Sequence, residues 1–207
     1  MTHHFQPTGL STYQQVIKRL FDFSSAFLGL LLVWPIILIA ALLSSFDTKA
    51  NGFFIQKRVG RNGKIFHLLK IRTMRIDTAN TSTVTTRSDA RITRLGTWFR
   101  RFKIDELPQL VNVLLGHMSL VGPRPDVPGY ADQLIGSDRI ILSIRPGITG
   151  PASLKYVNEE ELLNTQDNPE KYNNEVIWPD KVTINKEYIM HYSFIDDIKY
   201  IIKTLRA

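Results

Sequence analysis

The 207-residue sequence contains no cysteine. This absence excludes a disulfide scaffold, a thiolate zinc site and a cysteine nucleophile, and it fits a reducing compartment. Acidic residues are also few, because 19 Asp and Glu face 26 Lys and Arg and leave a net charge of +7. A basic protein favours an anionic partner, which can be nucleic acid, an anionic membrane or a phosphorylated substrate.

Charge is absent altogether from one long segment, the 24 residues from Phe23 to Phe46. About 20 apolar residues in a helix are enough to cross the hydrocarbon layer of a bilayer. A removable signal peptide is disfavoured, because the run is too long and no small-residue cleavage pattern ends it. A single membrane-spanning helix is a strong alternative on hydropathy alone.

Two features of this segment favour a helix that bends inside the membrane. Pro35 lies near the middle of the run, where it removes a backbone hydrogen bond and clashes with the preceding turn. Basic residues flank both ends, with Lys18 and Arg19 before the run and Lys49 after it, so the positive-inside rule assigns no orientation to a crossing helix. We therefore predict a re-entrant helix that enters and leaves by the same face.

The stretch from Lys57 to Lys103 is strongly basic. It contains thirteen Lys or Arg, and only Asp77 and Asp89 oppose them. An ordinary mixed surface does not have this imbalance. A non-catalytic tether that grips anionic lipid or nucleic acid would account for the basic stretch and the apolar run together.

The remaining patterns predict short secondary-structure elements. Apolar runs at 53–59 and 64–71 flank Gly60-Arg61-Asn62-Gly63, which indicates a β-hairpin. Leucines and a valine over 107–115 have helical spacing, and so have apolar residues over 188–205. The latter stretch predicts one amphipathic helix that packs on the domain or lies in the membrane interface.

Two adjacent acids, Asp105 and Glu106, precede the helix predicted at 107–115. Pro108 is tolerated in a first helical turn, so both acids fall at or just before the helix N-terminus. They can simply complement the helix dipole. However, they also follow a block of three cations at 100–103, and a carboxylate kept ionised there can serve as a nucleophile or as a Mg²⁺ ligand.

Two arginines lie in stiff loops after that helix. Arg124 stands between Pro123 and Pro125, and Arg145 precedes Pro146 in a turn-rich strip. Restricted backbones lose little entropy when a guanidinium group binds a phosphate. With the acid pair, these loops form a set suited to phosphate chemistry.

These motifs resemble those of the bacterial sugar transferase family, the monotopic phosphoglycosyl transferases. The resemblance covers nearly the whole chain and its blocks occur in the family order. They are Lys18-Arg19-Leu20-Phe21-Asp22, Lys70-Ile71-Arg72-Thr73-Met74, Asp105-Glu106-Leu107-Pro108-Gln109-Leu110, Asn112-Val113-Leu114, Met118-Ser119-Leu120-Val121-Gly122-Pro123-Arg124-Pro125 and Arg145-Pro146-Gly147-Ile148-Thr149-Gly150.

The resemblance implies a reaction. A nucleotide diphosphate sugar, commonly UDP-linked, would donate its sugar-1-phosphate to a polyprenyl phosphate, the first membrane step of lipid-linked glycan assembly for capsule, O-antigen, exopolysaccharide or glycoprotein. It implies that Asp105 forms a phosphosugar-aspartyl intermediate and that Glu106 holds Mg²⁺. It places Arg100, Arg124 and Arg145 as phosphate-binding groups.

The same resemblance implies a membrane arrangement. Lys18 and Arg19 would anchor the chain to lipid headgroups, and Trp34 with Pro35 would form the bend. The chain departs from common family patterns at Trp34, at His117 and over 151–154, so neither the sugar nor the nucleotide follows from the sequence.

We therefore expect a mostly helical α+β fold with a small β-hairpin and amphipathic interfacial helices. Residues 1–50 would form an arm and the re-entrant membrane helix, and residues 51–207 one compact catalytic domain. The expected location is the cytoplasmic face of the bacterial inner membrane. Expected partners are the nucleotide diphosphate sugar, polyprenyl phosphate and membrane lipids, with no nucleic acid; a homodimer is compatible with the sequence.

Overall fold

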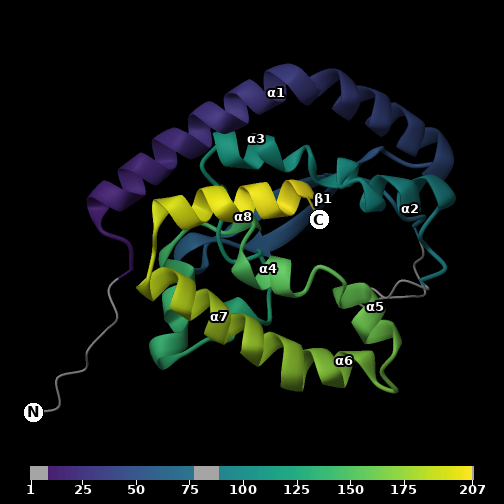
Figure 1. Cartoon of the computed structure of the whole chain (residues 1–207). Coiled ribbons are helices and arrows are strands. Elements are labelled where there is room, and N and C mark those ends of the chain that lie inside the picture. Colours follow the sequence, from purple (N-terminus) through teal and green to yellow (C-terminus); the bar gives the residue numbers. More distant parts are fainter. Residues whose placement is uncertain (1–8, 77–88, 207) are drawn as a thin grey trace, which may run out of the picture.

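The computed structural model describes residues 9–76 and 89–206. The fold is mostly helical α+β, as predicted, and Figure 1 shows the long helix α1 arching over the shorter elements. In chain order the elements are α1 (Thr12–Thr48), β1 (Phe53–Val59), η1 (Arg61–Gly63), β2 (Ile65–Ile71), α2 (Arg94–Arg101), η2 (Ile104–Glu106), α3 (Gln109–Leu114), β3 (Ser119–Val121), η3 (Ala131–Gln133), η4 (Gly136–Ser143), β4 (Gly147–Thr149), α4 (Pro151–Lys155), α5 (Glu159–Asn164), α6 (Pro169–Tyr172), η5 (Asn173–Ile177), α7 (Trp178–Met190) and α8 (Phe194–Arg206).

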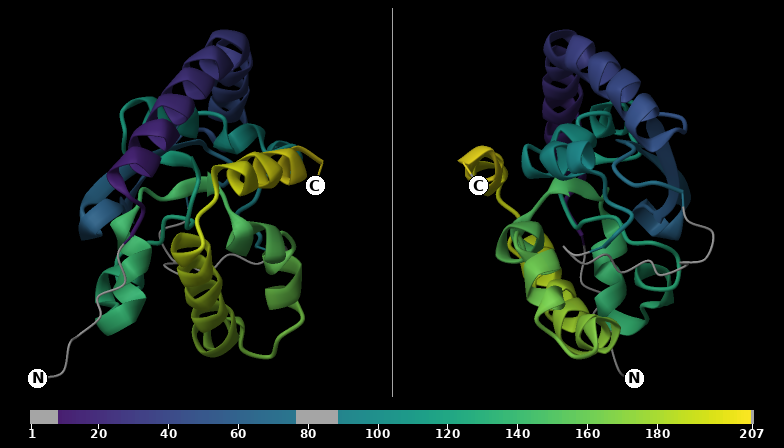
Figure 2. Two further views of the ribbon diagram at one scale, coloured as in Figure 1. Left: turned by 60° about the vertical axis from the view of Figure 1, so that its left-hand side comes forward. Right: turned by 90° about the vertical axis from the view of Figure 1, so that its right-hand side faces the viewer.

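Helix α1 is continuous over 37 residues and includes Pro35. It begins at a capping box, in which the Ser11 hydroxyl accepts from Gln14 N and the Gln14 side chain accepts from Ser11 N. Figure 2 shows the helix bent between two arms that descend on either side of its apex. The predicted bend is therefore present in the structure, and the helix bends without losing its helical assignment.

The two faces of α1 differ sharply in residue size. Small and polar side chains face the protein, including Ala26, Ala40, Ala41 and Ser44. Large apolar side chains point outward along the whole segment, and in its most apolar window 22% of the helix is buried. The exposed large residues of this face, each between 46% and 78% exposed, are Phe23, Phe27, Leu28, Leu31, Leu32, Trp34, Ile36, Leu38, Ile39, Leu42, Leu43 and Phe46.

The predicted β-hairpin is confirmed. Strands β1 and β2 pair antiparallel, with Phe53 opposite Ile71 and Val59 opposite Ile65. The turn contains two left-handed residues, Asn62 at φ 58° and Gly63 at φ 75°. Asn and Gly are the residues that adopt this conformation most readily, so the turn sequence fixes the register.

Helix α1 shares two apolar cores with the rest of the chain. Its first half contributes Ala26 to a core with Phe66 of β2 and Val113 of α3. Its second half contributes Ile37, Ala40 and Ala41 to a core with β2 and α2. A third core lies beneath η4, α7 and β3. The helix is thus fixed against the hairpin and α3 by packing along its length.

The C-terminal region differs from the prediction of one helix over 188–205. Two helices, α7 and α8, are separated by a short break around Tyr192 and Ser193. The Ser193 carbonyl accepts from the N–H groups of Asp196 and Asp197, which starts a new helix in another direction. The apolar spacing continues through this break, so periodicity alone did not reveal it.

Candidate active site

The acid pair lies in a tight turn between α2 and α3. Lys103 adopts a left-handed conformation at φ 57°, and the 3₁₀ turn η2 then carries Asp105 and Glu106 into the protein. Pro108 precedes the first residue of α3. The prediction that both acids fall just before this helix is confirmed. Asp105 is 7% exposed, so the turn presents a buried carboxyl group and not a surface charge.

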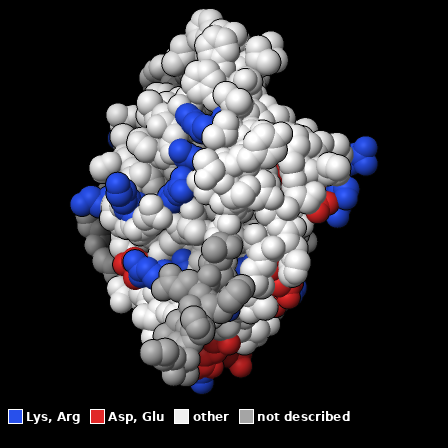
Figure 3. All heavy atoms as spheres, turned by 90° about the vertical axis from the view of Figure 1, so that its left-hand side faces the viewer, with Lys and Arg blue, Asp and Glu red and all other residues white. Residues whose placement is uncertain are grey.

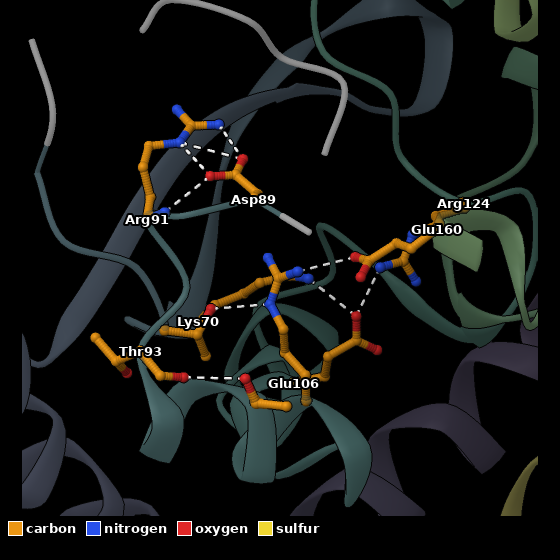
Figure 4. A network of polar contacts seen from close by, with 10 residues as sticks. Lys70, Asp89, Arg91, Thr93, Glu106, Arg124 and Glu160 are labelled. Carbon is orange, nitrogen blue, oxygen red and sulfur yellow. Dashed lines mark hydrogen bonds and ion pairs between the residues drawn. The ribbon is translucent and has the colours of Figure 1, made fainter. Parts of the chain in front are cut away.

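Glu106 is held by two cations from different elements. Lys70, at the end of β2, lies with its Nζ 2.9 Å from Glu106 Oε1, and Arg124 Nη2 lies 2.6 Å from the same oxygen. Figure 4 shows these three side chains in one polar network. Burial alone would raise the pKa of Glu106, but Arg124 and Lys70 together hold it far below its ordinary value. Glu106 is therefore ionised.

Asp105 differs from its neighbour in having an unsatisfied oxygen. Its Oδ1 atom is buried and accepts no hydrogen bond within the described residues. Burial raises the pKa of Asp105, although Lys70 opposes that effect, and the Glu106 charge adds to it. A buried carboxylate oxygen without a partner is costly. It is also free to bond to an incoming electrophile or cation.

Arg100 brings a third cation to the site. Its Nε donates to Thr73 Oγ1 at 3.1 Å, and its Nη1 lies 2.9 Å from Glu160 Oε1. Arg100 is also one of the charges that lower the Asp105 pKa. The structure therefore places Arg100 and Arg124 near the acid pair, and the phosphate-binding role that the resemblance gives them stays a prediction.

A pair of short strands positions Arg124. Strand β3 runs parallel to β4, and beyond it Gly122 N donates to Thr149 O and Gly147 N donates to Pro123 O, both at 2.8 Å. A Cβ atom on Gly147 would lie 2.1 Å from Gly122 N, so only glycine allows the two backbones to approach this closely. The Pro123–Pro125 segment then projects Arg124 toward Glu106.

Arg145, which the resemblance gives as a third phosphate-binding group, lies apart from Arg100 and Arg124. Its Nε donates to the carbonyl of Gly116 at 2.8 Å. Gly116 follows the C-terminal end of α3, whereas the acid pair precedes the N-terminal end. Arg145 precedes β4, whereas Arg124 follows β3. Because the two strands are parallel, the two arginines lie at opposite ends of the strand pair.

Lys18 also differs from its predicted role as a headgroup anchor. Its Nζ lies 2.6 Å from Asp197 Oδ2 and the side chain is 7% exposed. The Tyr188 hydroxyl donates to the other Asp197 oxygen at 2.6 Å. An ammonium group in such a buried pair ties α1 to α7 and α8 and cannot reach a headgroup. Arg19 donates to the carbonyls of Val113 and Leu114, at 2.6 and 2.8 Å.

The predicted bend residues lie on the outer face of α1. Trp34 is 55% exposed, and Pro35 beside it is exposed as well. Neither contributes to the three buried cores. Their position leaves both available to a surrounding membrane.

Sequence reasoning missed three groups at this site. Lys70 was part of a quoted motif without a role, and alternation along the hairpin strand places it on the same face as the buried Phe66 and Leu68, where a lysine signals a partly buried charge that needs a partner. Glu160 lies in an acidic stretch that carried no recognised motif. Asp126 directly follows the second proline of the Arg124 loop, and burial raises its pKa to about 7, against the opposing charges of Lys181 and Arg58.

The carboxylate oxygens of the acid pair are chemically suited to a magnesium ion that also binds substrate phosphates. Asp105 Oδ1 is unpartnered, and only one Glu106 oxygen is engaged within the described residues. No cluster of three or more His, Asp or Glu that could form a full cage occurs among those residues. Magnesium commonly takes one or two carboxylates, with water and substrate phosphates as its other ligands.

Comparison with known proteins gives a consistent set of matches. The family described as "Bacterial sugar transferase" matches residues 13–207. An "Undecaprenyl-phosphate glucose phosphotransferase" of Komagataeibacter xylinus is 35% identical over 95% of this chain. The "UDP-glucose:undecaprenyl-phosphate glucose-1-phosphate transferase" of Escherichia coli K12 is 34% identical over 96% of it.

These relatives differ in length. This chain spans 36% of the K. xylinus protein and 41% of the E. coli protein. It spans 94% of the "Exopolysaccharide production protein PSS" of Rhizobium leguminosarum bv. phaseoli, with 36% identity. The matched unit thus occurs both within longer chains and as almost an entire protein.

Proposed function

The chain belongs to the bacterial sugar transferase family, and on that premise we propose that it transfers a sugar-1-phosphate from a UDP-linked sugar to a polyprenyl phosphate. The Komagataeibacter xylinus and Escherichia coli relatives are named for undecaprenyl phosphate, which supports this class of acceptor. The single observation that carries the proposal is the buried Asp105, with an unpartnered oxygen, beside a Glu106 fixed by Lys70 and Arg124.

The reaction would proceed in two displacements. An Asp105 oxygen attacks the phosphorus that bears the sugar, and the bond from that phosphorus to the bridging oxygen breaks, which releases the nucleoside monophosphate. The phosphate of the polyprenyl acceptor then attacks the same phosphorus. The acyl-phosphate bond breaks, Asp105 returns as a carboxylate, and a polyprenyl diphosphate sugar leaves.

The cations of the site would offset the charge of the transferred group. Phosphoryl transfer depends chiefly on positioning and on stabilising the negative charge of the transition state. Arg100 and Arg124 come from different elements and are already fixed by hydrogen bonds. Lys70 would keep Glu106 oriented.

Magnesium is the cofactor we propose, with Glu106 as its protein ligand. When bound, the ion would neutralise diphosphate charge and support the leaving group. The free Glu106 oxygen and the unpartnered Asp105 oxygen suit such a hard cation.

The function implies a location at the inner face of the bacterial plasma membrane, where nucleotide sugars occur. We propose that α1 enters and leaves by this face. The support is its bend, its apolar outer surface and the basic residues at both ends. Trp34 and Pro35 would then lie at the deepest point.

A covalent intermediate is the direct test of the function. Enzyme incubated with Mg²⁺ and a panel of nucleotide sugars, without lipid, should release at most one equivalent of nucleoside monophosphate, and its intact mass should rise by a sugar phosphate. Asp105→Asn should lose both signals and at least about 10³-fold in turnover. It should unfold at no lower temperature, because it removes a buried, unpaired carboxylate.

The alternative is a non-catalytic membrane tether that uses only its basic charge. It predicts no nucleotide release with any donor and no change in behaviour when Asp105 is replaced. Release that begins only after lipid is added would instead indicate direct transfer without an aspartyl intermediate. Either result overturns the corresponding part of the proposal.

Topology is tested separately by cysteine labelling, since the chain has no cysteine of its own. Single cysteines at Tyr13 and Glu175, both exposed, should resist an impermeant reagent in intact cells and react after permeabilisation. Pro35→Ala should shift part of the population toward labelling at position 13, because it restores a helical hydrogen bond. Labelling at Tyr13→Cys alone in the otherwise unchanged protein would show a spanning helix.

A further inference from the structure

The segment that carries Arg124 is held by the β-hairpin as well as by the β3–β4 pair. Val59 N, at the end of β1, donates to the carbonyl of Asp126 at 2.9 Å, and Arg58 Nη1 donates to the carbonyl of Pro125 at 2.9 Å. The Arg124 side chain is 44% exposed, so packing does little to fix it. Its position therefore depends on the backbone on either side.

Arg58 is itself held in one orientation by a residue of its own strand. Its Nε lies 3.0 Å and its Nη2 2.7 Å from Gln56 Oε1, while Nη1 binds the carbonyl of Pro125. All three nitrogens of the guanidinium group are therefore engaged, and these acceptors are neutral oxygens. Because the guanidinium group is a rigid, planar fork, the position of Gln56 sets the direction in which Nη1 points.

The side of the hairpin that carries Arg58 also carries Lys70. Arg58 lies opposite Phe66 in the strand register, and Lys70 lies four residues further along β2, on the same side. Phe66 belongs to the apolar core shared with α1 and α3, so this side of the hairpin is fixed to the rest of the chain. One strand pair thus holds Glu106 through Lys70 and the Arg124 segment through Arg58.

Arg58 is close enough to the candidate active site for its charge to act there. Burial, aided by the charge of Arg124, lowers the pKa of Arg58 to about 10, against the opposing charges of Asp126 and Glu106. Arg58 therefore stays protonated at neutral pH and keeps all its donors. A substitution that retains the positive charge but removes the fork separates the effect of charge from the effect of hydrogen bonding.

We propose that Arg58 is a positioning residue: by holding the carbonyl of Pro125, it fixes the place at which Arg124 meets the donor phosphates. Arg124 Nη2 lies 2.6 Å from Glu106 Oε1, and a misplacement of about 1 Å is enough to weaken such a contact strongly. A lysine at position 58 would donate from a single nitrogen, so it could not bind Pro125 and Gln56 with the same geometry.

The part of this proposal that concerns donor phosphates rests on the proposed function, whereas the ordering of the Arg124 segment does not. Amide hydrogen exchange of the full chain in detergent measures that order without any substrate. A chain that releases no nucleoside monophosphate with any donor would defeat the proposed function, and the exchange rates would still decide whether Arg58 orders the segment.

Arg58→Lys and Arg58→Gln are compared with Arg139→Lys as the matched control. Arg139 is exposed and, like Arg58, donates from Nη1 to a loop carbonyl, that of Leu134, at 3.2 Å. The control is needed because Lys and Arg side chains also gather on the surface, as Figure 3 shows for one face of the molecule. Thermal unfolding in the same detergent verifies that each variant is folded.

The kinetic test uses the first displacement without lipid, followed by nucleoside monophosphate release. Arg58→Lys and Arg58→Gln should each raise the donor KM about tenfold and lower kcat less than about threefold. Partial unfolding would act differently, because it removes active molecules and lowers kcat at constant KM. In an Arg124→Gln background, Arg58→Lys should change KM less than about twofold, since the group that it positions is gone.

Gln56→Met is a milder variant, because it removes the acceptor that orients Arg58 and leaves the charge; it should raise KM about threefold. Amides of the Arg124 segment, residues 124–127, should exchange at least about tenfold faster in Arg58→Lys than in Arg139→Lys. Unchanged exchange in Arg58→Lys, full retention of donor KM by the lysine, an unaltered KM in Gln56→Met, or an equal effect of Arg58→Lys with and without Arg124 would each overturn the positioning role.

Discussion

The cations at the two ends of α3 differ in what surrounds them. At the N-terminal end, Lys70 and Arg124 share Glu106, and Arg100 pairs with Glu160. At the C-terminal end, Arg19 and Arg145 donate to main-chain carbonyls of Val113, Leu114 and Gly116. An ion pair fixes a cationic side chain in one geometry but neutralises its charge. A carbonyl acceptor also fixes the side chain, but it leaves the positive charge available to a ligand.

This difference separates two uses of positive charge. A site for group transfer needs its cations aligned before substrate arrives, and internal carboxylates provide that order. A site that only holds an anion can keep its charge open, because the ligand itself completes the pairing. The predictions that follow remove one feature at a time from the first site.

Lys70→Met should have the largest effect of these changes. It leaves Glu106 buried with Arg124 as its remaining ion-pair partner among the described residues, so the carboxylate loses orientation and charge compensation. We expect kcat/KM for nucleotide-sugar turnover to fall by about 10²-fold, the usual scale for loss of one preorganised charge contact. Steady-state kinetics at saturating Mg²⁺ measure this.

Lys57→Met is the matched control for Lys70→Met. It removes the same charge from an exposed position on the partner strand β1. Its kinetics should stay within about twofold of the unchanged enzyme, as for other exposed surface changes. Equal losses from both variants would mean that total charge, and not the Lys70–Glu106 pair, governs activity.

The parts of the fold that the sequence predicts well are the local ones. An Asn-Gly turn requires left-handed backbone, so Asn62 and Gly63 specify the hairpin without help from distant residues. Pro108 likewise marks the start of α3. The break between α7 and α8 depends instead on Ser193 and on packing around Asp197, and the apolar spacing does not record it.

The same distinction applies to the site. Asp105, Glu106 and Arg124 lie in compact motifs, and the structure brings them together. Arg145 has an equally suggestive motif, but the β3–β4 pairing directs it to Gly116 at the other end of α3. Glu160 is 60 residues from Arg100 in sequence, so only the tertiary fold reveals their contact.

Glu160→Gln should improve donor binding. In the structure Glu160 occupies an Arg100 nitrogen that the proposed function assigns to substrate phosphate. Removing a half-exposed ion pair frees Arg100 at modest energetic cost, so we expect the donor KM to fall by about three- to fivefold with little change in kcat. The first half-reaction, followed by nucleoside monophosphate release, measures both constants.

Glu170→Gln is the control for that change, since it removes an acid from the first turn of the nearby helix α6 at an exposed position. It should leave the donor KM unaltered. If Glu160→Gln instead raises KM, Glu160 positions Arg100 for the donor and does not compete with it.

The smallest expected effect concerns pH. Burial raises the pKa of Asp126 to about 7, and its neighbours include Arg124, Arg58, Lys181 and Glu159. Because the raised pKa favours the protonated acid, Asp126 is mostly neutral at pH 6 and mostly ionised at pH 8. The negative charge of ionised Asp126 offsets part of the positive charge of Arg124, which weakens binding of the donor phosphates. The donor KM should therefore rise by about twofold from pH 6 to pH 8.

Asp126→Asn should remove this rise, because an amide does not titrate. The lipid-free half-reaction is the right assay, since the diester phosphates of a nucleotide diphosphate sugar do not titrate near neutral pH, whereas the acceptor is a phosphate monoester whose second ionisation lies near pH 6. A rise in KM that persists in Asp126→Asn would place the titrating group elsewhere. Among the described acids Arg124 would then depend on Glu106 alone, and the contrast with Arg19 and Arg145, which donate to main-chain carbonyls, would be sharper.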